Sequence, residues 1–191
     1  MAMTPSSSGA PATISAGYRA AQAKLHADHA EYGMASVYFA PLVAQVVRAN
    51  KVRQVLDYAA GKGRLAEALQ AQLKETVSVV PYDPAIEAWS ATPQPTDMVA
   101  CIDVLEHIEP EHLEAVLDDL KRVTQRIGVL TISTGPAKRV LPDGRNAHLI
   151  QQPAAWWLPR LMARFELIAF NRMENGFWVI VEPGAAPAAK P

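Results

Sequence analysis

The sequence has little cysteine and no long apolar run, and both absences restrict the class of protein. Cys101 is the single cysteine among 191 residues, so the chain has no internal disulfide and no CxxC pair for a zinc site. No apolar stretch approaches the roughly 20 residues of a membrane-spanning helix. The N-terminus lacks a basic region followed by an apolar core, so it does not resemble a secretory signal. We therefore expect a cytoplasmic protein without a membrane partner.

An excess of charge of either sign is also missing. Lysine and arginine number 18 and aspartate and glutamate 19, which gives a net charge of −1. Because binding to nucleic acid depends on a basic surface, we expect no nucleic-acid partner. Hydrophobic residues make up 50% of the chain, enough for one domain with a full core. These features do not define an oligomeric state.

Short apolar runs alternate with helical patterns along the chain. Residues 1–12 and 183–191 are rich in small residues and proline, so we expect disordered ends around a single domain of residues 13–182. Strands are predicted at 52–58, 76–83, 97–103 and 126–134, and helices at 13–31, 35–49, 64–73 and 109–125. FELIAF and GFWVIVE predict a terminal antiparallel hairpin. This alternation predicts an α/β fold with a mostly parallel sheet covered on both faces.

Three of the predicted strands finish in an acid. Asp57, Asp83 and Asp103 stand at the ends of VRQVLDY, TVSVVPYD and DMVACID. An acid is poorly suited to a strand interior, whereas ligands of parallel α/β sheets bind beyond the carboxyl ends of the strands. We therefore expect these carboxylates to line a polar ligand crevice.

Small residues crowd the stretch after Asp57, and two ligand classes fit such a stretch. Gly61 and Gly63 let the backbone approach a ligand closely. With Ala66 they satisfy the dinucleotide pattern G-x-G-x-x-[G/A], and Asp83 stands where a ribose-binding acid belongs. Asp57 argues against a dinucleotide, because a carboxylate at this strand end would repel a pyrophosphate. The other candidate is S-adenosylmethionine (SAM), whose ammonium, cationic sulfur and ribose hydroxyls suit acids.

The motifs in this order resemble class I SAM-dependent methyltransferases. The family's first motif is a strand, an acid and x-Gly-x-Gly-x-Gly, and here it is Asp57-Tyr-Ala-Ala-Gly61-Lys-Gly63. Its second motif, an acid that ends the next strand and binds the ribose, corresponds to Asp83 in VVPYDP. The run DMVACIDVLEHIEP, residues 97–110, matches the family's fourth strand and the segment after it. The resemblance covers about residues 35–182 and implies a compact, Rossmann-like three-layer sandwich.

Two features depart from the family pattern. Ala59 stands where the family usually has its first glycine, and a φ above zero there would cost on the order of 1 kcal/mol. The segment 84–96 is too short for a helix, a third strand and an adenine-contacting loop. We therefore expect a reduced third-strand region, in which groups near Trp89, Ile102 and Asp103 contact adenine.

The resemblance implies SAM as the cofactor and a set of residues that bind it. They are Asp57, Tyr58, Ala59, Ala60, Gly61, Gly63, Tyr82, Asp83, Pro84, Ile102, Asp103, Val104 and, from a segment over the cofactor, Tyr32. His107 and His148 are the candidates for a general base, because the pKa of histidine lies near working pH. His26 is expected to be solvated. HExxH-like spacing is missing, so we expect no metal.

The implied reaction is methyl transfer from SAM to an oxygen, nitrogen or sulfur nucleophile. The fourth strand is not followed by an Asn/Asp-Pro-Pro-aromatic motif, which would have indicated amino groups of nucleic-acid bases. This favours a small-molecule acceptor, for example a sugar or another metabolite, with a protein acceptor left open. Two further classes stay open: a non-catalytic partner-binding module with the same fold, and an NAD-dependent oxidoreductase.

Overall fold

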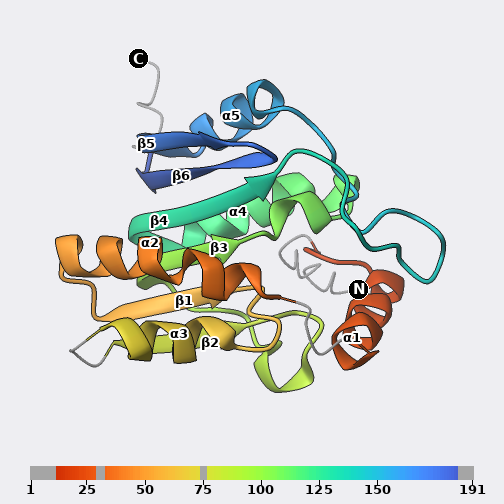
Figure 1. Cartoon of the computed structure of the whole chain (residues 1–191), viewed down its shortest axis with the longest axis horizontal. Helices are drawn as coiled ribbons and strands as arrows, with labels where there is room; N and C mark the ends of the chain where they lie inside the picture. Colours follow the sequence, from red (N-terminus) through yellow and green to blue (C-terminus); the bar gives the residue numbers. More distant parts are fainter. Residues whose placement is uncertain (1–11, 29–32, 74–76, 185–191) are drawn as a thin grey trace, which may run out of the picture.

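The computed structural model describes residues 12–28, 33–73 and 77–184, and a six-stranded sheet forms its centre (Figure 1). The strands are β1 (Gln54–Tyr58), β2 (Ser78–Tyr82), β3 (Thr96–Ile102), β4 (Thr124–Ser133), β5 (Phe165–Met173) and β6 (Gly176–Pro183). Their order across the sheet is β2-β1-β3-β4-β6-β5. The first four are parallel, and β6 and β5 add the antiparallel hairpin. The predicted fold class is confirmed.

Helices cover both faces of this sheet, which makes three layers (Figure 1). The helices are α2 (Ala35–Asn50) and α3 (Arg64–Gln72) on one face, and α4 (Leu113–Val123) and α5 (Ala154–Met162) on the other. Because successive side chains of a strand point to opposite faces, Val55 of β1 packs in the α2–α3 core and Leu56 in the α4–α5 core. Burial on both faces explains why the parallel strands are nearly continuous apolar runs.

The third-strand region is reduced, as predicted. Residues 84–95, all described, hold no strand, and a short 3-10 helix, η1 (Glu87–Trp89), follows β2 instead. This leaves β2 at the edge of the sheet. Pro81 lies within β2, where an edge strand tolerates the missing backbone N–H.

A further helix, α1 (Ala16–Asp28), lies beyond the carboxyl ends of the parallel strands (Figure 1). Tyr18 and Leu25 of α1 pack against Leu141 and Ala147 of the loop after β4. The Tyr18 hydroxyl also donates a hydrogen bond to the carbonyl of His107, at 2.6 Å. These contacts hold α1 across the open end of the sheet. Within the described residues, every helix is too short or too polar to cross a membrane.

Candidate functional site

The chain turns sharply where β1 ends, and the turn depends on left-handed backbone conformations. Gly61 and Gly63 have φ of 55° and 68°. Ala59 also has a positive φ, 60°, so the cost on the order of 1 kcal/mol that the sequence suggested for this alanine applies. A Cβ on Gly61 would lie 2.9 Å from Cε1 of His26, so a larger residue would displace this ring and also strain the left-handed backbone. The turn therefore brings bare backbone to the rim of the sheet.

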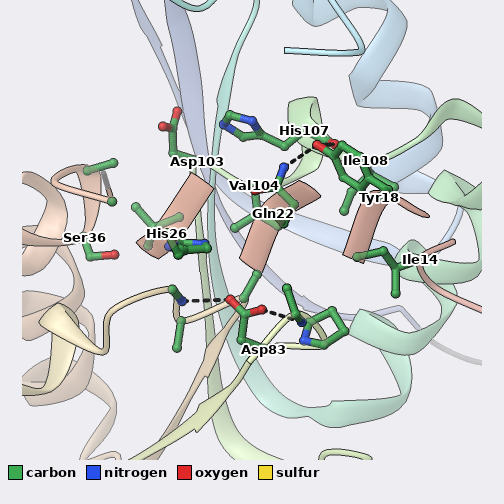
Figure 2. Close-up of a pocket in the computed structure, with 18 residues that line it drawn as sticks. Ile14, Tyr18, Gln22, His26, Ser36, Asp83, Asp103, Val104, His107 and Ile108 are labelled. Atoms are coloured by element: carbon green, nitrogen blue, oxygen red, sulfur yellow. Dashed lines mark hydrogen bonds between the residues drawn. The ribbon is translucent and has the colours of Figure 1, made fainter. Parts of the chain in front are cut away.

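Asp83 ties the end of β2 to this turn. Its Oδ2 accepts a hydrogen bond from the Gly61 N–H at 2.9 Å, and its Oδ1 accepts one from the Ala85 N–H at 2.8 Å (Figure 2). The side chain is only 4% exposed. Each carboxylate oxygen has a second acceptor position, so Asp83 can also accept hydrogen bonds from ligand hydroxyls.

Asp57 lies behind this arrangement with an unsatisfied carboxyl oxygen. The residue is 2% exposed, and Oδ2 has no hydrogen-bond partner among the residues that the structure describes. Burial, and then the charge of Asp83, raise the pKa of Asp57 to about 7. A buried carboxylate without a partner is costly unless a positive group compensates it. The strand end is therefore suited to a ligand with a positive charge.

A first cavity opens between the strand ends and α1 (Figure 2). Of the predicted cofactor residues, it is lined by Ala59, Ala60, Gly61, Asp83, Pro84, Ile102, Asp103 and Val104. Asp57, Tyr58, Gly63 and Tyr82 do not line it, and Tyr32 lies outside the described residues.

The residues that do not line the first cavity support its walls. The Tyr58 hydroxyl donates a hydrogen bond to Asp119 of α4 at 2.8 Å, and its ring packs edge-on against Tyr82 at 4.9 Å. Gly63 precedes the first turn of α3, and a Cβ there would lie 3.1 Å from the Trp89 ring. Trp89 thus contacts the glycine turn from outside the first cavity.

The wall contributed by α1 was missed by the sequence analysis. Tyr18, Gln22 and His26 line the first cavity, and Figure 2 shows them projecting from one helix. The expectation that His26 is solvated is wrong, because α1 turns this half-buried ring toward Gly61, and burial lowers its pKa. The sequence predicted a helix here, and side chains four residues apart share one face of a helix. Nothing in the sequence indicated that this face docks on the strand ends.

A second cavity, of about 500 Å³, adjoins the first. Its lining includes Asp103, His107, Ser133, Gly135, Lys138, Arg139, His148 and Asn175. Asp103 and His107 line both cavities. The rings of His107 and His148 meet edge-on at 4.7 Å between centroids. The two histidines predicted as base candidates are thus in contact, although they lie on different loops.

Buried charges set the protonation of the groups after β3. Burial and then the charge of Asp103 raise the pKa of Glu106 well above its usual value. Burial would raise the pKa of Asp103 too, but hydrogen bonds with Glu106 and Ser133 and the nearby His107 hold it below its usual value. Burial lowers the pKa of His107 to about 4, against the pull of Asp103. At neutral pH, Asp103 is therefore ionised and His107 is neutral.

Both histidine rings are held by backbone carbonyls. Nδ1 of His107 lies 2.9 Å from the Ala147 carbonyl, and Nδ1 of His148 lies 2.7 Å from the Gly135 carbonyl. Because a carbonyl can only accept, each Nδ1 carries a proton, and in a neutral ring the lone pair is then on Nε2. The Nε2 atoms are therefore the basic and ligand-type atoms of these residues.

Comparisons with known proteins identify the fold. The sequence matches the family described as "Methyltransferase domain" over residues 30–173. The fold is similar to the 1,6-didemethyltoxoflavin-N1-methyltransferase of Burkholderia thailandensis, solved with its substrate and S-adenosylhomocysteine, with a TM-score of 0.60, 16% identity, and coverage of 91% of this chain and 92% of that chain. None of the curated protein sequences compared with the chain matches it.

Two further solved structures have the same fold. Magnesium protoporphyrin IX methyltransferase from Synechocystis PCC 6803, with bound S-adenosylhomocysteine, gives a TM-score of 0.54 at 17% identity, covering 78% of this chain and 83% of that one. The DhpI-SAM-HEP complex gives 0.56 at 16% identity, covering 88% and 95%. The family match excludes the two alternatives left open by the sequence, the NAD-dependent oxidoreductase and the non-catalytic module. The prediction of a SAM-dependent methyltransferase with a Rossmann-like fold is confirmed, and the chain belongs to the methyltransferase domain family.

Proposed function

We propose that the chain transfers the methyl group of SAM to a nucleophilic oxygen, nitrogen or sulfur of a small molecule, and that residues 13–182 act as one domain in doing so. The observation that carries the proposal is the boundary between the two cavities. Asp103 and His107 line both of them, so a ligand in the first cavity and a ligand in the second meet at these side chains. Such proximity is the main contribution that a protein makes to direct group transfer.

The residues of the first cavity fit SAM. Asp83 has acceptor positions for ribose hydroxyls, and the Ala59–Gly61 turn offers close approach to backbone. The Asp57 carboxyl, buried outside the cavity lining, favours a positive ligand through its charge. Ile102 and Val104 supply apolar wall for the adenine. When bound, SAM supplies a methyl group already activated by its positive sulfur. The protein then has to position the acceptor and remove a proton where the acceptor carries one.

The second cavity supports a small acceptor with polar groups. Its volume of about 500 Å³ lies in the range of small-molecule sites. Lys138 and Arg139 on its wall favour an acceptor with an anionic group. The Burkholderia thailandensis enzyme of similar fold binds 1,6-didemethyltoxoflavin, which is a small molecule as well. We therefore favour a small metabolite over a protein acceptor.

His148 is the better base candidate of the two histidines. Burial lowers the pKa of His107 to about 4, so its neutral ring is a weak base. His148 has its Nδ1 proton fixed on the Gly135 carbonyl, so Nε2 holds the lone pair that would accept a proton. His107 then serves to orient His148 through their ring contact.

The test pairs cofactor binding with a labelling screen. The full chain is titrated with SAM and S-adenosylhomocysteine in a calorimeter, and then incubated with methyl-labelled SAM and sets of small hydroxyl, amine and thiol compounds. We expect micromolar binding of both ligands and label in at least one low-molecular-weight product, most readily an anionic one. Binding with label only in added protein would contradict the small-molecule acceptor, and absent binding would contradict the assignment of the first cavity.

A further inference from the structure

Three metal-ligating side chains converge where the two cavities meet. One ligand atom from each of Asp103, His107 and His148 lies within 4.8 Å of the other two. Asp103 and His107 follow β3, whereas His148 comes from the loop after β4. Figure 2 shows the Asp103 carboxylate and the His107 ring projecting side by side into the space between the elements. Two imidazoles and a carboxylate on one side of a cleft form a donor set typical of divalent transition metals.

Each of the three side chains is held in place by a second group, as metal ligands usually are. The Nδ1 atoms of His107 and His148 donate to the carbonyls of Ala147 and Gly135, which makes Nε2 the ligand-type atom of each ring. The Ser133 hydroxyl donates to Oδ1 of Asp103 at 2.9 Å. This arrangement fixes the imidazole tautomer that coordination requires.

The backbone at Asp103 is strained in a way that places its carboxylate at this site. Asp103 has a φ of 59°, a conformation that costs a residue with a side chain about 1 kcal/mol or more. A hydrogen bond from the Asp103 N–H to the Thr131 hydroxyl, at 2.9 Å, stabilises this strained conformation. Strain retained at the end of a buried strand is typical of functional positions.

A second carboxyl group is buried beside this cluster. Glu106 is fully buried, and its Oε2 has no hydrogen-bond partner among the described residues. A bound ion beside it would compensate this unpaired buried oxygen.

We propose that Asp103, His107 and His148 bind one divalent transition-metal ion of the Zn²⁺, Co²⁺ or Mn²⁺ type, with its open coordination positions toward the second cavity. Metal–ligand distances of about 2.0–2.2 Å place ligand atoms about 3–3.5 Å apart, so a separation of 4.8 Å closes by about 1.3–1.8 Å when the ion binds. No metal was expected from the sequence, because the three ligands are separated along the chain and do not form a compact motif.

The ion selects the chemistry of the acceptor, and this part rests on the proposed function. Its open positions take an oxygen donor, so the acceptor is a hydroxyl compound. With the ion bound, His148 is a ligand and no longer the base. A hydroxyl bound to a divalent ion has a lowered pKa and releases its proton to the water of the cleft. Lys138 and Arg139 on the same wall suit an anionic group elsewhere on that compound.

The experiment measures metal binding without SAM or acceptor. Full-length protein without an affinity tag is freed of metal by chelation and titrated with Co²⁺, whose visible absorption reports its ligands, and then with Zn²⁺ in competition. We expect one ion per chain, displacement of Co²⁺ by Zn²⁺, and Mg²⁺ binding at least 10-fold weaker, because imidazole ligands disfavour Mg²⁺.

The variants His148→Gln and Asp103→Asn test the ligands, and His112→Gln is the matched control. His112 lies near Glu109, at 3.9 Å, away from the cluster. We expect Co²⁺ affinity to fall at least 100-fold in the first two and less than 3-fold in the control. Equal affinity in all three, or no bound Co²⁺ in the wild type, would overturn the proposal. Circular dichroism identifies a variant that fails to fold. If Asp103→Asn does not fold, the Co²⁺ affinity of His148→Gln decides between the outcomes.

Calorimetry with S-adenosylhomocysteine on the same metal-free samples separates the two proposals. Cofactor binding without metal binding would refute the metal site and leave the proposed function standing. Metal binding without cofactor binding would do the reverse. When an acceptor is found, chelation is expected to lower methyl transfer at least 10-fold, and added Zn²⁺, Co²⁺ or Mn²⁺ should restore it.

Discussion

The carboxyl ends of β1 and β3 lie side by side in the sheet, yet they are built in opposite ways. Both have a buried acid and a residue with positive φ, Ala59 after β1 and Asp103 after β3. After β1, small residues and backbone N–H groups form the surface. After β3, titratable side chains form it. The β1 end is suited to binding a ligand through its backbone, and the β3 end to exchanging protons with a ligand through its side chains.

The difference also explains what each end requires of the chain. The parts of the β1 end lie in the stretch from Asp57 to Gly63, and one distant residue, Asp83, completes it. The β3 end needs His148, which a long loop returns to the sheet. The Ile150 N–H donates to the Glu106 carbonyl at 2.9 Å and holds that loop in place. One site is therefore local in sequence, and the other exists only in the folded chain.

The largest effect is expected from His148→Gln, which tests whether the two ends have separate roles. Methyl transfer to an acceptor from the labelling screen should fall about 1,000-fold, because a base or a metal ligand is lost. The affinity for S-adenosylhomocysteine should change less than 3-fold, since His148 does not line the first cavity. Initial rates and calorimetry measure the two quantities. A parallel loss of both would show that the two ends act as one site.

Asp83→Ala changes the β1 end instead, and should weaken the binding of S-adenosylhomocysteine. It removes the acceptor of the Gly61 and Ala85 N–H groups and the expected ribose contact. We expect the Kd for S-adenosylhomocysteine to rise about 100-fold, or about 2.7 kcal/mol, as a buried charged hydrogen-bond network is lost. Glu87→Ala, an exposed acid nearby, is the matched control and should leave the Kd unchanged. If both variants bind like the wild type, Asp83 supports the turn without contacting the ligand.

A smaller effect is expected from the pH dependence of stability at Asp57. Its pKa is raised from 3.8 to about 7 by burial and by Asp83, so the folded state binds a proton that the unfolded state releases. Stability from this group is therefore present below pH 4 and is lost as the pH rises toward 7. Between pH 5 and 8 the free energy of unfolding of the wild type should fall by about 1–3 kcal/mol more than that of Asp57→Asn.

Denaturant unfolding at several pH values measures this difference, because the comparison with Asp57→Asn cancels the contributions of other groups. Asp83 and Cys101 are the titratable neighbours that influence Asp57. Parallel curves for the two proteins would mean that the Asp57 carboxyl has a compensating partner in solution.

The sequence predicted the features whose cause is local. The apolar run MVACI in β3 and the small residues between Ala59 and Gly63 determine a buried strand and a close backbone approach, and both are present. The short 84–96 segment predicted the loss of a strand by length alone. The docking of α1 and the meeting of His107 with His148 depend instead on packing between distant segments. No local pattern encodes such contacts, so they emerge only from the fold.

The smallest expected effect, from Ala59→Gly, isolates what the positive φ costs at the β1 end. Alanine at a φ of 60° costs about 1–2 kcal/mol, and glycine relieves this strain but adds about 0.5–1 kcal/mol of entropy to the unfolded chain. We therefore expect Ala59→Gly to stabilise the protein by about 0.5–1 kcal/mol. At the β3 end, Asp103→Gly would relieve similar strain but remove a side chain that the site uses.

Ala60→Gly is the matched control, because Ala60 is the adjacent residue and has no positive φ. It should lose about 1–2 kcal/mol, from the entropic cost and from the loss of its buried methyl group. Denaturant unfolding of the three proteins gives both differences, and opposite signs are the expected result. Equal destabilisation would show that Ala59 adopts an ordinary backbone conformation in solution. Opposite signs would mean that the turn keeps its left-handed shape without the family's first glycine, because the surrounding contacts hold it there.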